Sequence, residues 1–426
     1  ALNKKNDSSK SIGSLNAYIG AGNSTFLNYD DLSTLNAKSY FDGSIGLSYS
    51  YKNFGIVNRI DIDQQYTNDT LYFGSVGKLQ NQNIGRIGES YISYQTKNSE
   101  FLLGRVNRNF GLINSNSLIF SPNPFSFDQI SYTLKNKILR FSTLFARLND
   151  KYGYDIRVSD TIQYDWYKRY LAVHRLEIFP SKNLAIAITE SVLFGGQSQH
   201  VLFNYLNPAN FFYLSKLTDR RGYEEQSANS FISLEFYYRY RNKLSIFSQF
   251  LIDDLDFKKE LRETYPDRLG WFTKLSYIDL IPQSQFHLTY TRVSNWTYNS
   301  FYTWGNYTYY GKSIGFPQHG IERIDVAFDI FKYNPFIYQV SISMEQSRQQ
   351  NLLTHFVGAK TSFPTGTPEY SITPKLKCTY FPSQYISGNI ELGYFFEDNK
   401  DHIPGLRSEG LFFYITLKAL GLFNLF

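Results

Sequence analysis

The stretch from 296 to 310 combines aromatic rings with small polar side chains at a density typical of carbohydrate-binding surfaces. Flat rings stack on the apolar C–H faces of sugars, while amides exchange hydrogen bonds with sugar hydroxyl groups. The candidate glycan-binding residues are Trp296, Asn299, Tyr302, Trp304, Asn306, Tyr309 and Tyr310. The same composition also fits an aromatic girdle at a membrane interface, or a loop that packs on itself. Residue types alone leave these alternatives open.

A second candidate chemistry is acyl hydrolysis at a lipid surface, because His174 and Glu190 fall on one predicted hairpin. Such an enzyme needs an activated nucleophile, and nothing in the sequence marks the hydroxyl of Ser191 as one. The six His and one Cys show no metal-ligand spacing, and no glycine-rich phosphate loop follows a strand. The sequence therefore predicts a protein that is not an enzyme and that uses no metal and no cofactor.

The hairpin that would carry His174 and Glu190 runs from 169 to 194. Two runs of mixed apolar and polar residues flank a tight turn at 180–183. In the second run, Leu184, Ile186 and Ile188 share one face, as the period of two in a β-strand requires. Only a few residues join these two strands, whereas longer segments separate each of them from its next neighbour.

The same pattern of short and long links recurs along the whole chain. Alternation and turn signals mark about 18 strands. They are 12–21, 41–51, 55–66, 87–96, 99–106, 128–135, 138–148, 169–180, 183–193, 228–240, 243–253, 269–278, 285–295, 320–332, 336–347, 369–382, 384–396 and 409–420. Strict alternation of short and long links predicts an all-β, up-and-down antiparallel transmembrane barrel over 12–426, preceded by a flexible polar tail at 1–11.

Composition agrees with a barrel in the outer membrane of a Gram-negative bacterium. No run of 18 apolar residues exists, which excludes membrane-spanning helices, yet Phe and Tyr number 37 and 36. Such rings suit the two membrane interfaces. An even strand number with short periplasmic turns places both termini in the periplasm. The net charge of +6 is spread without a basic block, so nucleic acid is not expected as a partner.

Charged residues at inward positions predict a polar lumen with cross-wall pairing. The predicted network comprises Arg105, Arg175, Glu177, Glu190, Glu235, Arg239 and Asp253. The loops 107–127 and 195–227 are too apolar to be freely solvated. We expect 107–127 to pack inside the barrel or against its rim, and loops to plug the lumen partly, with 195–227 as the best plug candidate. Strand parity places Glu190 on the lipid face, where a charge is costly. We therefore predict a β-bulge after Ile188 that turns Glu190 inward toward Arg175.

Several motifs give the chain a family resemblance. They are PFSFDQI at 124–130, YLAVHRLE at 170–177, YLNP at 205–208, FLIDD at 250–254 and GKSIGFP at 311–317. In these segments the chain resembles the Wzi-type capsule-assembly family of outer-membrane β-barrels. The resemblance implies an 18-stranded barrel that attaches or organises capsular polysaccharide without being an enzyme. Founding members also carry an N-terminal helical bundle, where this chain has its predicted tail.

The sequence therefore predicts a non-enzymatic outer-membrane barrel for binding or assembly of surface polysaccharide, capsular or exopolysaccharide. The expected partners are that polysaccharide and the lipid and lipopolysaccharide of the outer membrane. One alternative is an accessory subunit of an outer-membrane complex for protein insertion or export. Another alternative is a diffusion porin.

Overall fold

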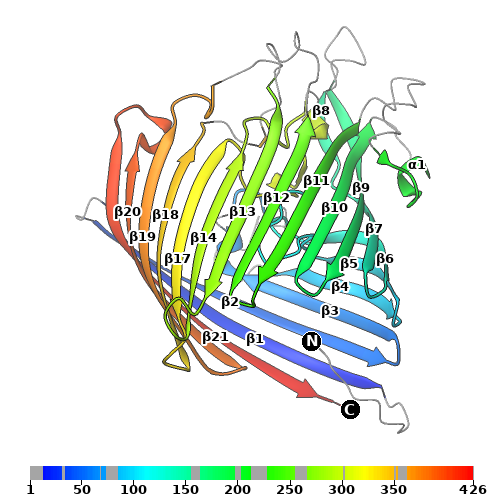
Figure 1. Cartoon of the computed structure of the whole chain (residues 1–426), viewed down its shortest axis with the longest axis horizontal. Coiled ribbons are helices and arrows are strands. Elements are labelled where there is room, and N and C mark those ends of the chain that lie inside the picture. Colours follow the sequence, from blue (N-terminus) through cyan, green and yellow to red (C-terminus); the bar gives the residue numbers. More distant parts are fainter. Residues whose placement is uncertain are drawn as a thin grey trace.

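Strands whose side chains alternate between two environments build the wall of the protein, which we describe from a computed structural model (Figure 1). The structure describes residues 13–30, 34–67, 69–72, 85–154, 164–196, 203–212, 228–254, 266–300, 303–349, 352–353 and 362–425. No helix among these residues is long and apolar enough to cross a membrane. The predicted tail at 1–11 lies outside the described residues.

The wall strands are long and consecutive. They are β1 (Ser14–Asp30), β2 (Thr34–Tyr51), β3 (Phe54–Asp63), β4 (Gly85–Gln95), β5 (Ser99–Val106), β6 (Phe127–Lys135), β7 (Leu139–Arg147), β9 (Tyr164–Ser181), β10 (Leu184–Gly196), β11 (Ala228–Tyr240), β12 (Leu244–Asp254), β13 (Arg268–Ile278), β14 (Ser284–Val293), β17 (Ile321–Ile330), β18 (Phe336–Ser347), β19 (Glu369–Ser383), β20 (Ile386–Asp398) and β21 (Arg407–Asn424). The smaller elements are η1 (Gln64–Thr67), β8 (Lys151–Tyr154), α1 (Phe203–Leu206), η2 (Thr303–Gly305), β15 (Thr308–Tyr309), β16 (Lys312–Ser313) and η3 (Lys400–His402).

Each wall strand pairs antiparallel with its neighbours, and β1 pairs with β21 from Asn16↔Asn424 to Asp30↔Gly410. This pairing closes the sheet, so every wall strand has two partners and no edge is left. The sheet has 19 strands, of which β8 only extends the hairpin with β9 beyond the wall. The predicted fold, a closed up-and-down barrel of 18 strands, is confirmed.

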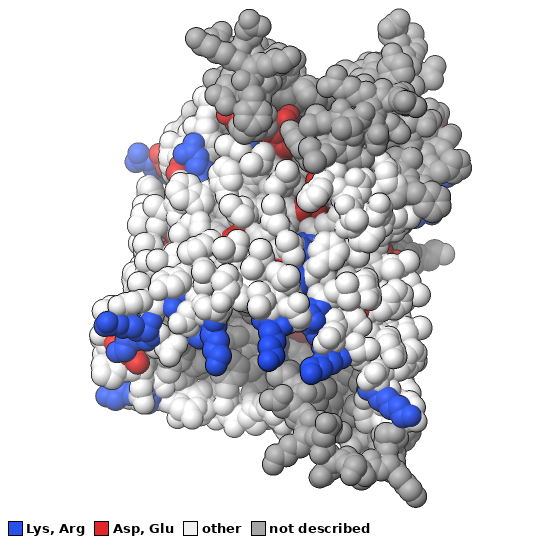
Figure 2. All heavy atoms as spheres, turned by 45° about the vertical axis from the view of Figure 1, so that its right-hand side comes forward, with Lys and Arg blue, Asp and Glu red and all other residues white. Residues whose placement is uncertain are grey.

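Short turns of two to five residues, such as Lys52–Asn53 and 279–283, join alternate strand pairs at one end of the barrel. Most of them carry basic residues that extend into solvent, among them Lys97, Lys182 and Arg241. Figure 2 shows lysine and arginine side chains in a row near the lower end of the molecule. The longer links lie at the opposite end, where they supply the residues that enter or cover the barrel.

The first hairpin differs from the prediction. We expected strands at 12–21 and 41–51 with a long link, but β1 reaches Asp30 and β2 begins at Thr34. The added part is rich in Asn, Ser and Thr, and its alternation is too polar to predict a strand. Its backbone ladder is instead supported by polar cross-strand contacts, such as Asn23 Nδ2 donating to Ser39 Oγ at 3.1 Å. Strict alternation of short and long links therefore fails at this one connection.

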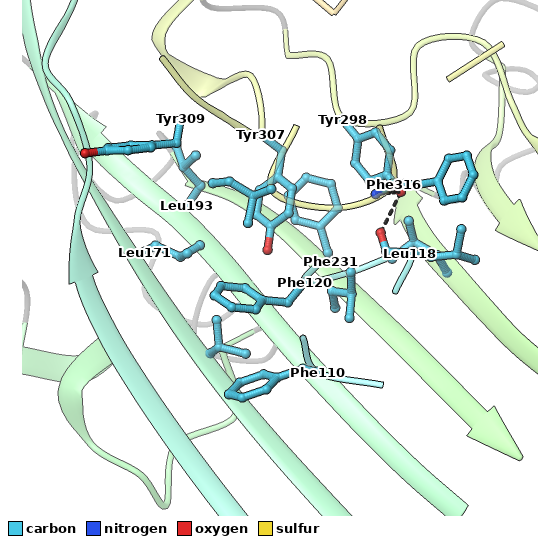
Figure 3. Close-up of a cluster of buried hydrophobic side chains, with 14 of the residues drawn as sticks. Phe110, Leu118, Phe120, Leu171, Leu193, Phe231, Tyr298, Tyr307, Tyr309 and Phe316 are labelled. Atoms are coloured by element: carbon cyan, nitrogen blue, oxygen red, sulfur yellow. Dashed lines mark hydrogen bonds between the residues drawn. The ribbon is translucent and has the colours of Figure 1, made fainter. Parts of the chain in front are cut away.

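A plug fills the lumen next to β6–β14. It consists of segment 107–126 and of the described part of segment 294–320, namely 294–300 and 303–320, which meet where Ser121 N–H donates to the Ile314 carbonyl at 2.8 Å. Their apolar side chains pack against inward residues of the wall, as Figure 3 shows for Phe120, Leu171 and Tyr307 among others. The expectation that segment 107–127 packs inside is confirmed. The plug also includes the aromatic run at 296–310.

Polar wall residues hold the irregular backbone of the plug. Arg169 donates to the carbonyls of Asn306 and Thr308, each at 2.7 Å. Leu112 N–H donates to Glu235 at 2.8 Å, and Leu118 N–H donates to Gln249 at 2.8 Å. Buried backbone groups need such partners, because an unpaired amide away from water costs a few kcal/mol, about 1–3.

Three residues of the predicted charge network contact one another inside the wall. Arg175, only 2% exposed, donates to Glu235 at 2.6 Å and to Glu177 at 2.7 Å. Two other members form separate contacts: Arg105 pairs with Asp128 at 2.7 Å, and Asp253 accepts from the Tyr298 N–H at 2.7 Å. The lumen charges therefore form separate local groups along the wall. Arg105 pairs within the wall, whereas Asp253 bonds with the plug backbone.

Two further members differ in position, because Arg239 shares the inward parity of Glu235 on β11 whereas Glu190 does not. Arg239 is half-buried, and its Nε has no hydrogen-bond partner among the described residues. Glu190 stays on the outer face, because the pairing of β10 with β9 and β11 is regular through Ile188 and its only register shift lies between Leu184 and Ile186. The predicted bulge after Ile188 is therefore wrong. The reason is a partner on the outside: the Phe212 N–H donates to Glu190 Oε2 at 2.9 Å.

The loop 195–227 is also not the plug that we predicted, as far as it is described. Segment 203–212 includes α1 and lies against the outer face of β9 and β10 (Figure 1). Its Tyr205 and Phe212 pack on the outward residues Tyr170 and Phe194 of the wall. We call segment 203–212 the outer strap. The described part of this apolar loop therefore packs on the outside of the barrel and not inside it.

We predict that Glu235→Ala lowers the stability of the barrel strongly. It leaves the buried Arg175 with only Glu177 as a charged partner and removes the acceptor of Leu112 N–H. Breaking a buried pair on one side costs about 3–5 kcal/mol. The temperature at which the folded barrel unfolds, followed by its gel mobility or by circular dichroism, should fall clearly.

Glu391→Ala is the matched control, since Glu391 and Lys375 form a looser and more exposed lumen pair at 3.6 Å. Its expected cost is about 0–1 kcal/mol. Equal shifts of the unfolding temperature in the two variants would contradict the role given to Glu235.

Candidate functional site

The predicted glycan-binding residues lie mostly inside the plug. Trp296 is 1% exposed, and the side chains of Asn299, Trp304 and Asn306 are 0% exposed. Tyr309 is buried and Tyr310 is half-buried, while Tyr302 lies outside the described residues. These rings and amides do not form an open surface at the rim.

Their contacts inside the plug are structural. Trp304 stacks on Tyr167 of β9 with ring centroids 6.0 Å apart, and Asn306 Oδ1 accepts from the Ser300 N–H at 2.9 Å. Burial raises the pKa values of Tyr298 and Tyr307, which keeps both phenols neutral. These contacts, within the loop and to β9, match the alternative in which the loop packs on itself rather than on a sugar. Sugar binding by the seven residues stays a prediction.

A hollow lies between the plug and the wall strands β1–β3 and β21. We call it the vestibule; its volume is about 900 Å³, in the range of ligand sites. The residues that line it come from β1, β2, β3, β21, η1 and the two plug segments. They are Phe26, Asn28, Asn36, Lys38, Tyr40, Asp63, Gln65, Tyr66, Asp69, Phe125, Lys312 and Tyr414.

An aromatic corner forms one side of the vestibule. Tyr66 stacks on Tyr72 with centroids 4.9 Å apart, and both rings meet the edge or face of Phe125 at about 6 Å. Tyr66 belongs to η1, directly after β3, whereas Phe125 belongs to the plug. Burial raises the pKa of Tyr66 to about 12, so its phenol remains a neutral donor at physiological pH. The corner therefore joins the wall to the plug.

Charged groups surround the same corner. The Lys312 ammonium lies 4.3 Å from the centroid of Phe125 and 2.6 Å from the Asp69 carboxylate. Arg86 lies over the same ring at 4.1 Å and donates to Ser126 Oγ at 3.0 Å. Cations over an aromatic face are attracted to it, so these contacts fix Phe125 in place. A preformed ring with neighbouring donors and acceptors results.

Two further hollows adjoin the vestibule. One, of about 670 Å³, shares Asp63 and Tyr66 with it and extends along β1–β3 toward the short turn at Gln384. The other, of about 580 Å³, shares Lys312 and is also lined by His319 and Arg348. In this last hollow the buried imidazole of His319 contacts the Arg348 guanidinium, and burial lowers the pKa of His319. The vestibule and these two hollows leave one side of the lumen open, whereas the plug fills the other side.

The vestibule has the chemistry that carbohydrate recognition needs. Aromatic rings offer stacking faces, and Asn28, Asn36 and Gln65 bring amides to the same hollow. Lys38 and Lys312 add positive charge that would attract an acidic sugar. The lining contains both signs of charge, and its size suits a short stretch of a chain molecule rather than a single ion.

Sequence analysis missed the vestibule because its residues are dispersed. Phe26 and Tyr414 lie at opposite ends of the chain and become neighbours only when β1 pairs with β21. Phe125 stood out only as part of an apolar loop and of the motif at 124–130, not as a binding residue. One available signal was Gln64-Gln65-Tyr66, an amide and aromatic group at the end of a strand.

The residues considered for acyl hydrolysis do not share a site. His174 and Glu190 are direct cross-strand neighbours on the outer face. Ser191 follows Glu190 and therefore points to the lumen, where its hydroxyl bonds with the Tyr307 hydroxyl at 2.7 Å. The wall itself separates this hydroxyl from the His–Glu pair.

Comparison with known proteins agrees with this architecture. Residues 28–323 match the family described as "Capsule assembly protein Wzi". Among solved structures, Wzi of Escherichia coli, described as a carbohydrate-binding β-barrel involved in group 1 capsule assembly, aligns with a TM-score of 0.61 and 10% identity. That alignment covers 93% of this chain and 83% of the E. coli protein.

Other outer-membrane barrels share the fold at similar identity. OccAB4 of Acinetobacter baumannii aligns with a TM-score of 0.53 and 8% identity, covering 96% of this chain and 98% of that protein. OccK1 of Pseudomonas aeruginosa gives 0.52 and 12%, covering 96% and 99%. No curated protein sequence matches the chain. The family match extends over more than half of the chain, from β1 into β17, and the protein therefore belongs to the Wzi capsule-assembly family.

Proposed function

We propose that this barrel binds surface polysaccharide, capsular or exopolysaccharide, and takes part in its assembly without catalysing a reaction. Membership of the Wzi family supports the class of ligand. The observation that carries the proposal is the vestibule, where aromatic rings and amides from β1, β2, η1, β21 and plug segment 107–126 meet in one preformed hollow. A hollow inside the barrel mouth can hold part of a long chain while the rest stays outside.

The vestibule and the aromatic run at 296–310 are competing locations for the sugar. Rings such as Trp296 and Trp304 would have to leave the plug before they could stack on a sugar. The corner formed by Tyr66 and Phe125 lines an existing hollow and needs no such rearrangement. We therefore favour the vestibule, with Tyr310 as the residue of the run that is less deeply buried.

We further propose an outer-membrane location with the short turns and both termini in the periplasm. Outer-membrane barrels pair short periplasmic turns with longer extracellular loops. Several basic turn residues lie beside aromatic rings, as in Lys52 over Tyr51 at 5.1 Å and Arg241 over Tyr240 at 5.0 Å. Such pairs suit the membrane interface, where rings meet headgroups and cations meet lipid phosphates. Lipid and lipopolysaccharide are then the immediate surroundings of the wall.

A diffusion porin remains the second candidate function, because adjoining hollows run along one side of the lumen. An accessory role in a protein insertion or export complex is the third, and its signature would be a stoichiometric protein partner in intact-membrane pull-downs. The plug favours binding over diffusion, since it is held by buried hydrogen bonds across the lumen.

The glycan prediction uses a double variant, Tyr66→Ala with Phe125→Ala. Two stacking rings at about 0.5–1.5 kcal/mol each predict a roughly tenfold loss of affinity. Co-sedimentation or calorimetry with purified surface polysaccharide from the source cells measures it. Gln65→Ala, which leaves the aromatic corner intact, should weaken binding less.

Tyr338→Ala on the outer wall is the matched aromatic control and should bind as the wild type does. The variant Trp296→Ala with Trp304→Ala tests the competing location, provided that the barrel still folds. Binding that survives loss of the vestibule rings but not loss of these tryptophans would move the site to the 296–310 run.

The porin alternative predicts a different electrical behaviour. Because the plug occupies the lumen beside β6–β14, we expect near-zero steady conductance in planar bilayers. High steady conductance from the pure protein would contradict an occluded binder and support diffusion through the hollow side.

Orientation is tested by labelling single cysteines on intact cells in a Cys378→Ser background. A bulky thiol reagent should modify Pro404→Cys, in the link before β21, without permeabilisation. Gln384→Cys, in a short turn, should react only after the outer membrane is opened. The reverse pattern would place the short turns outside the cell.

A further inference from the structure

The outer strap forms an arch over the wall. Its two ends pack tightly: Tyr205 lies 4.5 Å from Phe194 between ring centroids, and Phe212 stacks on His174 at 4.0 Å. Between them, Pro208, Ala209 and Phe211 stand away from the strands, and Phe211 is 68% exposed. Both ends are fixed while the middle is raised.

A cavity of about 360 Å³ lies beneath this arch. Its floor is the outward face of three strands, with Leu176 of β9, Ile188 of β10 and Ile232 of β11. Its roof is the raised middle of the outer strap. His174, Glu190 and Asn210 also border the cavity, and Glu190 already accepts from the Phe212 N–H. Most of the exposed lining is apolar, so the cavity offers water few of the two to four hydrogen-bonding partners that a buried water needs. An apolar occupant is favoured.

The cavity lies at membrane depth. Ile188 is four residues from the start of β10 at Leu184, or about 13 Å along the strand at 3.3 Å per residue. With strand tilts of about 35–45°, it lies roughly 10 Å above the end with the short turns, inside an apolar band about 25 Å tall. Exposed Leu234 and Phe236 continue the floor toward that end. The medium next to the cavity is therefore hydrocarbon.

The outer strap satisfies its own backbone at this depth. The Ala209 N–H donates to Asn207 Oδ1 at 3.1 Å, and the Asn210 N–H donates to the Asn207 carbonyl at 3.1 Å. The Phe212 N–H donates to Glu190. Irregular backbone is tolerated within a bilayer only when its polar groups have such partners. Glu190 therefore has a role on the outer face: it ties the arch to the wall.

From this geometry we infer a lateral lipid site: the outer strap holds one acyl chain of a membrane lipid against Leu176, Ile188 and Ile232. The chain would enter from the surrounding bilayer and lie under Phe211. Because both ends of the outer strap are already fixed on the wall, binding of an acyl chain costs the protein little conformational entropy. The inference is independent of polysaccharide binding, since it concerns the opposite face of the wall.

The test uses the full-length protein in nanodiscs whose phospholipid carries a photoreactive diazirine near the end of an acyl chain. After illumination, peptide mass spectrometry should find the label enriched in 203–212 and around Ile188, relative to the exposed wall around Val340. Ala209→Trp fills the space under the arch and should reduce labelling of the strap by about tenfold.

Val340→Trp introduces the same indole at a wall position far from the strap and should leave strap labelling unchanged. Lipopolysaccharide added to the nanodiscs distinguishes the source of the chain. Competition assigns the site to lipid A chains and lack of competition assigns it to phospholipid, and both support an acyl site. Strap labelling no higher than at Val340, or unchanged in a folded Ala209→Trp variant, would overturn the inference.

Discussion

Irregular backbone inside a closed barrel must find hydrogen-bond partners, and the rest of this structure depends on how that requirement is met. The plug has few ladders of its own among the described residues, only the short pair β15 and β16. Its carbonyls and amides bond partly with one another, as the Ser121 N–H does with the Ile314 carbonyl, and partly with wall side chains such as Arg169, Arg268 and Glu235. These wall charges are themselves buried, so each needs the plug as much as the plug needs it.

This mutual dependence explains why the lumen is asymmetric. The wall residues that join the plug core come from β6–β14 and the first residue of β17. The strands β1–β3 and β18–β21 contribute none of the described core residues, and their inward side chains line hollows instead. The vestibule is thus the space left where the plug ends, and Phe125 and Lys312 are plug residues that face it. A binding site arises at the boundary between the filled and open parts of the lumen.

The wall could be predicted from the sequence, because strand periodicity and turn chemistry are local. Leu184, Ile186 and Ile188 gave the correct parity of β10, and the short turns gave the correct strand number. The first hairpin was missed where β1 and β2 become polar, since nothing apolar marks a strand there. The vestibule could not be predicted from the sequence, because Phe26, Tyr66 and Phe125 approach one another only when the barrel closes and the plug is in place. Sequence composition showed that 296–310 was unusual, but burial rather than exposure accounts for its rings.

The failure at Glu190 shows what decides on which face of a barrel a loop packs. Loops 107–127 and 195–227 are both apolar, so the hydrophobic effect drives either one to any suitable surface. Glu235 on β11 points inward and accepts the Leu112 N–H, whereas Glu190 on β10 points outward and accepts the Phe212 N–H. In each case a wall carboxylate meets a backbone amide that apolar packing alone would leave unpaired. An acid at an apparently wrong parity therefore need not signal a bulge, because it can mark the face on which an irregular segment will be held.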